Sequence, residues 1–135
     1  MSQWKYYDVG VNNVGSYQVG GVPFVTGSTL SAGQEQEITF PYVTKTITII
    51  QSSSADADLR IHFAATGSGR VIDGNHYIVL RADKENVELP SMKCRNVYLS
   101  APSSNSVSVS YKLHASLTRI DSKHMWYLTG SGITD

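Results

Sequence analysis

The sequence contains a single cysteine, Cys94, and few charged residues. One cysteine cannot form a disulfide within the chain, so packing and hydrogen bonds must hold the fold. Charged residues make up 16% of the sequence, compared with about 25% in an average globular domain. The eleven basic residues are balanced by eleven acidic ones, and no block of lysine and arginine occurs. Binding to phosphates needs such a basic field, so we expect no nucleic-acid partner.

Helical and membrane patterns are also missing. No ten-residue segment places apolar residues at helical spacing between capping residues. The N-terminal residues contain no apolar run, which predicts neither a signal peptide nor a membrane span. We therefore expect a chain that is made and assembled in a cytoplasm. Cys94, which lies just before the apolar residues 97–99, is expected to be buried.

Residue sets that carry chemistry are lacking as well. The four histidines do not stand at metal-ligand spacing, although His62 and His114 fall on predicted polar faces and could meet across a sheet. Asp56 and Asp58 resemble the start of a calcium loop without its later ligands. Serines lie near His114, but nothing orients that histidine and no Gly-x-Ser-x-Gly motif occurs. The sequence predicts no enzymatic activity, no cofactor and no metal site.

What the chain does contain is a long alternating segment, residues 106–118. Successive side chains of a strand point to opposite faces, so this pattern predicts one apolar and one polar face. At about 3.3 Å per residue the thirteen residues would span about 43 Å, the height of a small domain. The apolar side consists of Val107, Val109, Tyr111, Leu113, Ala115 and Leu117, and the polar side of Ser106, Ser108, Ser110, Lys112, His114, Ser116 and Thr118.

Shorter strand-like segments fill the rest of the chain. They are separated by turn residues such as those of Asp73-Gly74, a dipeptide that favours positive φ. Several short strands with turns between them predict an all-β fold, an antiparallel, jelly-roll-like β-sandwich of about seven or eight strands. The length favours one domain over residues 1–135. The remaining expected strands are 35–40, 43–51, 59–63, 76–82, 87–90 and 97–100.

Residues 1–33 differ from this body, since glycine interrupts their valine- and tyrosine-rich sequence every few residues. Glycine weakens a strand, and Pro23 excludes a central strand position, so we expect an extended N-terminal arm. Its aromatic residues must pack either on the chain's own sandwich or on a neighbouring subunit, and both alternatives stay open. The candidate interface residues are Trp4, Tyr6, Tyr7, Tyr17 and Phe24, with Met125, Trp126 and Tyr127 as a second group near the C-terminus.

Three segments together give the chain a family resemblance. They are the arm with residues 22–28, the threonine- and isoleucine-rich residues 40–49, and the glycine- and serine-containing end, residues 128–135. In the composition and order of these segments, the whole chain resembles small virion structural proteins of tailed bacteriophages. It is similar to capsid decoration (cement) proteins. The resemblance implies a non-enzymatic protein that binds and stabilises a capsid surface.

The same resemblance implies the major capsid protein or other virion subunits as partners. It also implies a homo-oligomer, with a trimer favoured, located in virions that assemble in the host cytoplasm. The expected contacts are the arm and the C-terminal segment, while the sandwich projects outward. Two alternatives stay open: a phage tail, fibre or baseplate component, and a carbohydrate-binding β-sandwich module, which eight tyrosines and two tryptophans would suit.

Overall fold

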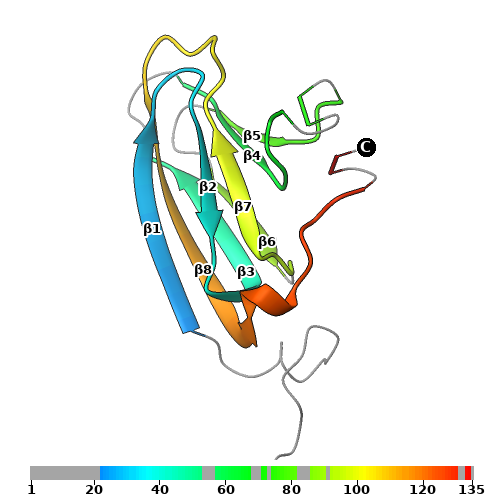
Figure 1. Cartoon of the computed structure of the whole chain (residues 1–135). Helices are drawn as coiled ribbons and strands as arrows, with labels where there is room; N and C mark the ends of the chain where they lie inside the picture. The colour runs from blue at the N-terminus through cyan, green and yellow to red at the C-terminus, as the bar shows by residue number, and fades with distance from the viewer. Residues whose placement is uncertain are drawn as a thin grey trace, which may run out of the picture.

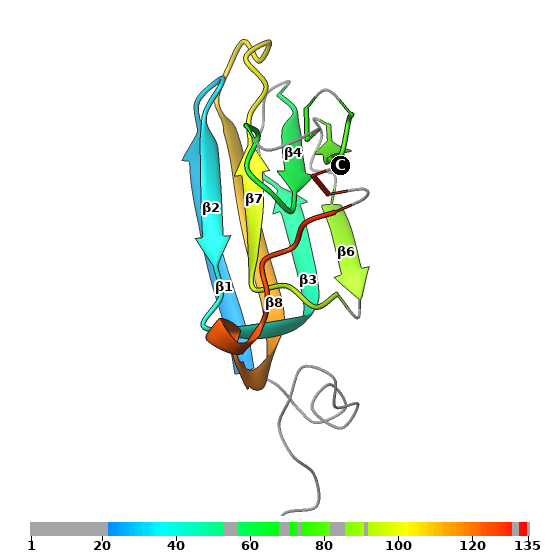
Figure 2. The same cartoon turned by 45° about the vertical axis from the view of Figure 1, so that its right-hand side comes forward.

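A computed structural model describes residues 22–52, 57–67, 71–72, 74–81, 86–90, 92–130 and 133–134. Two antiparallel sheets of four strands each face one another, which confirms the predicted β-sandwich and its number of strands (Figures 1 and 2). The first sheet has the order β1 (Val22–Leu30), β8 (Val109–Asp121), β3 (Tyr42–Gln51) and β6 (Asn86–Pro90). The second sheet has the order β2 (Glu35–Thr39), β7 (Asn96–Ser100), β4 (Leu59–His62) and β5 (Ile78–Leu80).

The strand pairs are nested. β1 pairs with β8, β2 with β7, β3 with β6 and β4 with β5, so that each strand lies beside the one equally far from the other end of the series. A long hairpin that is rolled up into two sheets gives this pairing, which is the connectivity of an eight-stranded jelly roll. The observed order of the strands is therefore that of a jelly roll.

The alternating segment is the central strand β8. Tyr111, Leu113 and Ala115 are buried. Lys112 and His114, which alternate with them, are exposed, as the alternation predicts. The strand is shifted relative to the prediction, because it begins at Val109 and continues to Asp121. Thr118, expected on the polar face, is 2% exposed, and its hydroxyl donates to the Val43 carbonyl at 2.7 Å where the pairing of β3 with β8 is irregular.

The expected arm is partly a strand. Residues 22–30 form β1, which pairs with β8 along its whole length at the edge of the first sheet. This edge position tolerates Pro23, which would interrupt a central strand. A Cβ atom at Gly27 would stand 2.8 Å from the Tyr111 carbonyl oxygen, so glycine allows the close approach of β1 to β8. Residues 1–21 of the expected arm lie outside the described residues.

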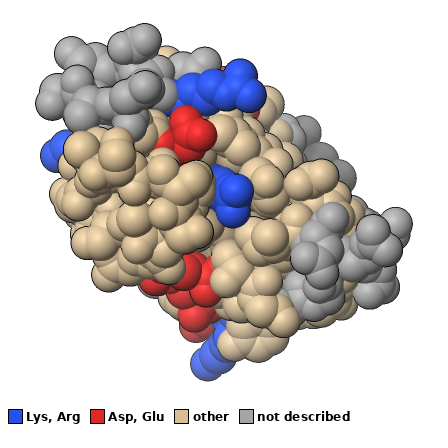
Figure 3. All heavy atoms as spheres, turned by 90° about the horizontal axis from the view of Figure 1, so that it is seen from above, with Lys and Arg blue, Asp and Glu red and all other residues tan. Residues whose placement is uncertain are grey.

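Charged side chains are dispersed over the described surface. On the end of the molecule seen in Figure 3, lysine and arginine side chains stand apart from one another, with aspartate and glutamate between them. Most of the described surface on this end is uncharged. The low charge content of the sequence thus leads to a surface on which the described residues form no continuous basic patch at this end.

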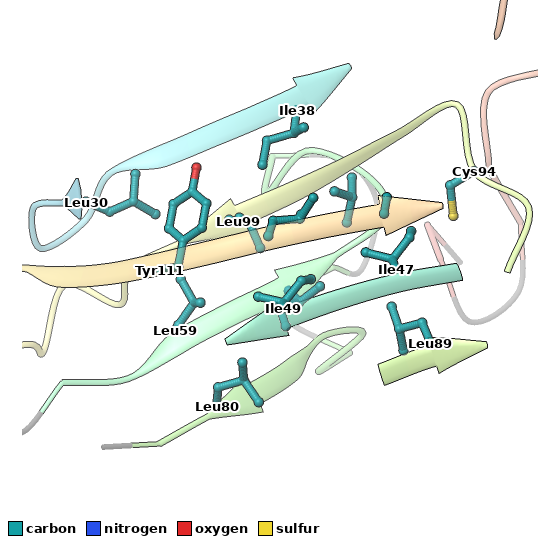
Figure 4. Packing of buried hydrophobic residues seen from close by; sticks show 14 of the residues in the cluster. Leu30, Ile38, Ile47, Ile49, Leu59, Leu80, Leu89, Cys94, Leu99 and Tyr111 are labelled. Carbon is teal, nitrogen blue, oxygen red and sulfur yellow. The ribbon is translucent and has the colours of Figure 1, made fainter. Parts of the chain in front are cut away.

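The core fills the space between the two sheets, and Figure 4 shows its side chains pointing inward from both. Tyr111 is the largest fully buried side chain, and its hydroxyl donates to the Gln36 side-chain oxygen on β2. This hydrogen bond joins the two sheets. A second, smaller cluster of Val43, Ile120 and Met125 lies near the end of β8.

We expect Cys94 to be unreactive in the folded protein. The residue is 1% exposed, and burial raises the pKa of its thiol to about 11, so almost no thiolate forms near neutral pH. A disulfide reagent at mildly alkaline pH should label the native protein only as slowly as it unfolds, and the denatured protein at once. Rapid and complete labelling of the native protein would contradict the burial of this residue.

Candidate functional site

The outer face of the second sheet carries an unusual set of polar side chains. Along β7, Val97 and Leu99 point into the core, so Asn96, Tyr98 and Ser100 point outward. The register places Tyr98 between Glu37 of β2 and His62 of β4. An outer face would normally be solvated, yet Asn96 is 2%, Ser100 5% and His62 0% exposed. Other parts of the chain must therefore cover these side chains.

One cover is the segment of residues 125–130, which we name the C-terminal strap. After β8 the short 3-10 helix η1 (Ser122–His124) turns the chain, and the strap then runs along the second sheet (Figure 2). Arg95 fixes the strap twice. Its guanidinium donates to the Met125 carbonyl at 3.0 Å and lies 4.0 Å from the centre of the Tyr127 ring. The strap is thus held against the sheet by one hydrogen bond and one cation–π contact.

A pocket of about 210 Å³ lies between the strap, the sheet and the connection that follows β4. The sheet contributes Asn96 and Tyr98, and the β4–β5 connection contributes Phe63 and two alanines. Tyr127, Leu128 and Thr129 of the strap form another wall, together with Thr134. None of the described residues that line the pocket is a lysine or an arginine. The pocket therefore combines aromatic rings with uncharged hydrogen-bonding groups.

Glu37 orients two of the polar groups at this pocket. One of its carboxylate oxygens accepts a hydrogen bond from the Asn96 side-chain amide at 2.5 Å and one from the Tyr98 hydroxyl at 3.3 Å. Burial, with the negative charge of Glu37 adding to it, raises the pKa of Tyr98, so this hydroxyl remains protonated and donates. Because a carboxylate only accepts, it fixes which way both groups point.

Beside the pocket, His62 and Ser100 form a buried pair. The His62 Nδ1 atom lies 2.6 Å from the Ala64 carbonyl oxygen, and its Nε2 atom lies 2.8 Å from the Ser100 hydroxyl. A carbonyl can only accept, so Nδ1 carries the proton and Nε2 accepts from the serine. Burial lowers the pKa of His62, so the imidazole is neutral near pH 7.

This arrangement has the atomic order of a serine–histidine nucleophilic pair, in which a third group orients the imidazole. Its position argues for a structural role. His62 is fully buried and Ser100 nearly so, and neither lines the described pocket, so a substrate does not reach the serine oxygen in this conformation. Instead, the pair ties the β4–β5 connection to the sheet. Glu35 adds a second tie, because its carboxylate accepts from the Thr66 backbone N–H at 2.8 Å.

The candidate interface residues differ in their exposure to solvent. Trp126 and Tyr127 on the strap are 56% and 59% exposed. Met125 is 2% exposed in the cluster with Val43 and Ile120, which corrects its assignment to an interface: in this structure it is a core residue. Phe24 is half-buried and packs edge-on against Phe40 with ring centres 5.2 Å apart. The other candidates, Trp4, Tyr6, Tyr7 and Tyr17, lie outside the described residues.

His62 and His114, which could have met across a sheet, do not meet. His62 belongs to β4 in the second sheet, whereas His114 belongs to β8 and is exposed on the outer face of the first sheet. Of the two aspartates compared with a calcium loop, Asp56 lies outside the described residues. Within the described ranges, no group of three or more histidine, cysteine, aspartate or glutamate residues is placed to hold a metal ion.

No protein-family model matches this sequence, and no curated protein is significantly similar to it. In the part of the chain that the structure describes, no helix has the length and apolar character needed to cross a membrane.

Proposed function

We infer that this chain is a non-enzymatic structural subunit of a virion, a capsid decoration protein that binds a capsid surface through the face carrying the C-terminal strap. The observation that carries the proposal is the exposed pair Trp126 and Tyr127 on a segment that Arg95 holds in place. Tryptophan, tyrosine and arginine are the residue types that dominate binding energy at protein interfaces. Two neighbouring aromatic side chains that are exposed to solvent are typical of a surface that binds a partner.

Preorganisation strengthens this surface as a binding site. Ordering a loop on association costs free energy, and that cost is smaller when the segment already has its bound conformation. The strap is anchored at Met125 in the core and at Tyr127 under the Arg95 guanidinium. A partner would therefore meet Trp126 and Tyr127 on a fixed base rather than on a free chain end.

The jelly roll supports the choice of a virion subunit by analogy. Eight-stranded jelly rolls occur in viral coat proteins and also in lectins. A fold alone does not determine a function, so the jelly roll supports the proposal by analogy and does not establish it. The low charge of the surface and the resemblance to phage virion proteins point the same way. Trp4, Tyr6, Tyr7 and Tyr17 remain proposed contacts on sequence grounds.

Removing the aromatic pair should weaken attachment to particles. We expect the double change Trp126→Ala with Tyr127→Ala to lower the affinity for capsids that lack the chain by at least about tenfold, because buried interface aromatics typically contribute 2 kcal/mol or more. Co-sedimentation of the purified full chain with such capsids measures this. Circular dichroism confirms that the variant is folded.

A matched control is Val25→Ser, which changes another exposed apolar side chain on the outer face of β1 in the opposite sheet. This variant should bind like the wild type. Unchanged binding of the double variant would remove the strap from the interface. The number of copies in purified virions tests the location: a number comparable to that of the shell subunits supports decoration, and a few copies would favour a tail component instead.

A further inference from the structure

The pocket beneath the strap is a second feature of this face, and the proposed capsid contact shares only Tyr127 with it. Its volume of about 210 Å³ is below the roughly 300–1,000 Å³ of pockets that hold drug-sized ligands. One six-membered ring with its substituents therefore fits, whereas a nucleotide or a peptide would extend far outside it. The pocket is partly open to solvent, so a larger molecule could place one terminal unit inside.

The lining specifies the chemistry of such a unit. Phe63, Tyr98 and Tyr127 supply aromatic surface, which suits a ligand with an apolar C–H face. Thr129 and Thr134 supply hydroxyls that both donate and accept, whereas the Asn96 amide, which is 2% exposed and donates to Glu37, offers little surface to a ligand. A ligand rich in hydroxyl groups matches this mixture, because each of its hydroxyls also donates and accepts.

The charge of the pocket lining further restricts the chemical class of the ligand. The described lining contains no basic side chain, and the nearby Arg95 guanidinium is already engaged by the Met125 carbonyl and the Tyr127 ring, so an anionic ligand would lose its hydration without gaining a direct cationic partner in the lining. The Glu37 carboxylate, which accepts from Asn96 and Tyr98, adds negative potential close to the same wall. It also fixes these two side chains before any ligand arrives, which reduces the entropy lost on binding.

We propose that this pocket binds one neutral pyranose ring of a glycan. The ring stacks on the aromatic wall, and its hydroxyl edge faces the Thr129 and Thr134 hydroxyls. The glycan belongs to a larger saccharide whose remaining units extend away from the pocket into solvent. This role shares Tyr127 with the proposed capsid contact, but it uses the cavity beneath the strap and does not involve Trp126.

Amide-resolved NMR titration of the full chain tests the proposal. The probes are the neutral methyl pyranosides of glucose, galactose, mannose and N-acetylglucosamine, with glucuronate as the anionic and p-cresol as the apolar comparison. We expect saturable shifts around Asn96, Tyr98 and Thr129 for at least one neutral sugar, with a Kd on the order of 1–10 mM, as is typical of so few ligand atoms.

Three variants separate the pocket from the remaining surface. Ala65→Trp should fill the cavity and abolish the shifts without removing a polar group. Thr129→Val, at an exposed position, should weaken binding by about tenfold through the loss of one hydrogen bond. His114→Gln on the opposite sheet should bind like the wild type.

Three results would overturn the proposal. The first is the absence of saturable shifts with every neutral pyranoside up to about 50 mM, well above the expected Kd. The second is binding that persists in the folded Ala65→Trp variant. The third is a preference for glucuronate or for p-cresol, which would assign the pocket to an acidic ligand or to an aromatic side chain of a protein partner. None of these outcomes depends on attachment to a capsid.

Discussion

The Tyr111→Ala variant is expected to lose about 3–5 kcal/mol of unfolding free energy, the usual cost of removing a large aromatic side chain from a core. Tyr111 is 1% exposed near the start of β8, and its ring lies between the two sheets (Figure 4). Domains of this size are stable by only about 5–15 kcal/mol, so one such change removes a large part of the total. Denaturant unfolding followed by circular dichroism measures the loss.

Two further variants isolate the contributions. Tyr111→Phe keeps the ring and removes the hydroxyl that donates to Gln36, so it should cost about 1 kcal/mol. Val25→Ala, at a side chain that is 73% exposed, should change stability by no more than about 0.5 kcal/mol. A loss below about 1 kcal/mol for Tyr111→Ala would mean that the ring is not packed between the sheets.

The position of Tyr111 could be predicted from sequence because alternation is a local property. From Val109 to Leu117, each apolar residue of β8 is two positions from the next, and a strand turns alternate side chains to the same face. The same rule fails at Thr118. There the pairing of β3 with β8 is irregular, and the hydroxyl finds the Val43 carbonyl inside the fold. Local alternation does not show where a ladder of long-range pairs is interrupted.

The candidate site could not be predicted in the same way. His62 falls on the outward face of β4, and the polar pattern therefore indicates exposure. Its burial involves segments far away in sequence, because the imidazole contacts Ser100 and the ring of Tyr98 on β7 and the Glu35 carboxylate on β2. Nothing in the spacing of these residues shows that they meet. The strap also explains the different fates of Met125 and Trp126, since neighbours on an irregular segment can point to opposite sides.

The outer faces of the two sheets differ in the burial of the hydrogen bonds that their polar side chains make. On the first sheet, polar side chains such as Thr29 and Ser110 pair with each other at 3.0 Å in an exposed position. On the second sheet, His62 pairs with Ser100 of the neighbouring strand and with the Ala64 carbonyl of the β4–β5 connection, and these hydrogen bonds are buried and harder to replace by water. His62 therefore places a buried titratable group in the second sheet.

Acidification should weaken the fold through His62. Burial lowers the pKa of His62 below its ordinary value of 6.5, with the Arg60 charge acting in the same direction. The Ala64 carbonyl and the Glu35 carboxylate, 3.8 Å from Nε2, oppose the shift without cancelling it. The unfolded chain therefore takes up the proton before the folded chain does. Stability is full above about pH 6.5 and falls as the pH drops toward the folded-state pKa.

The difference between variants isolates this effect. The free energy of unfolding of the wild type, measured from about pH 7.5 to about pH 5, should fall with a His62 contribution of at most about 1.4 kcal/mol per pH unit, the value for one proton. His62→Gln should lack this contribution, although its stability at neutral pH is lower because the buried Ser100 and Ala64 groups lose their partner. His114→Gln, at an exposed histidine, should follow the wild type. Parallel profiles for His62→Gln and the wild type would show that His62 does not remain neutral in the folded protein.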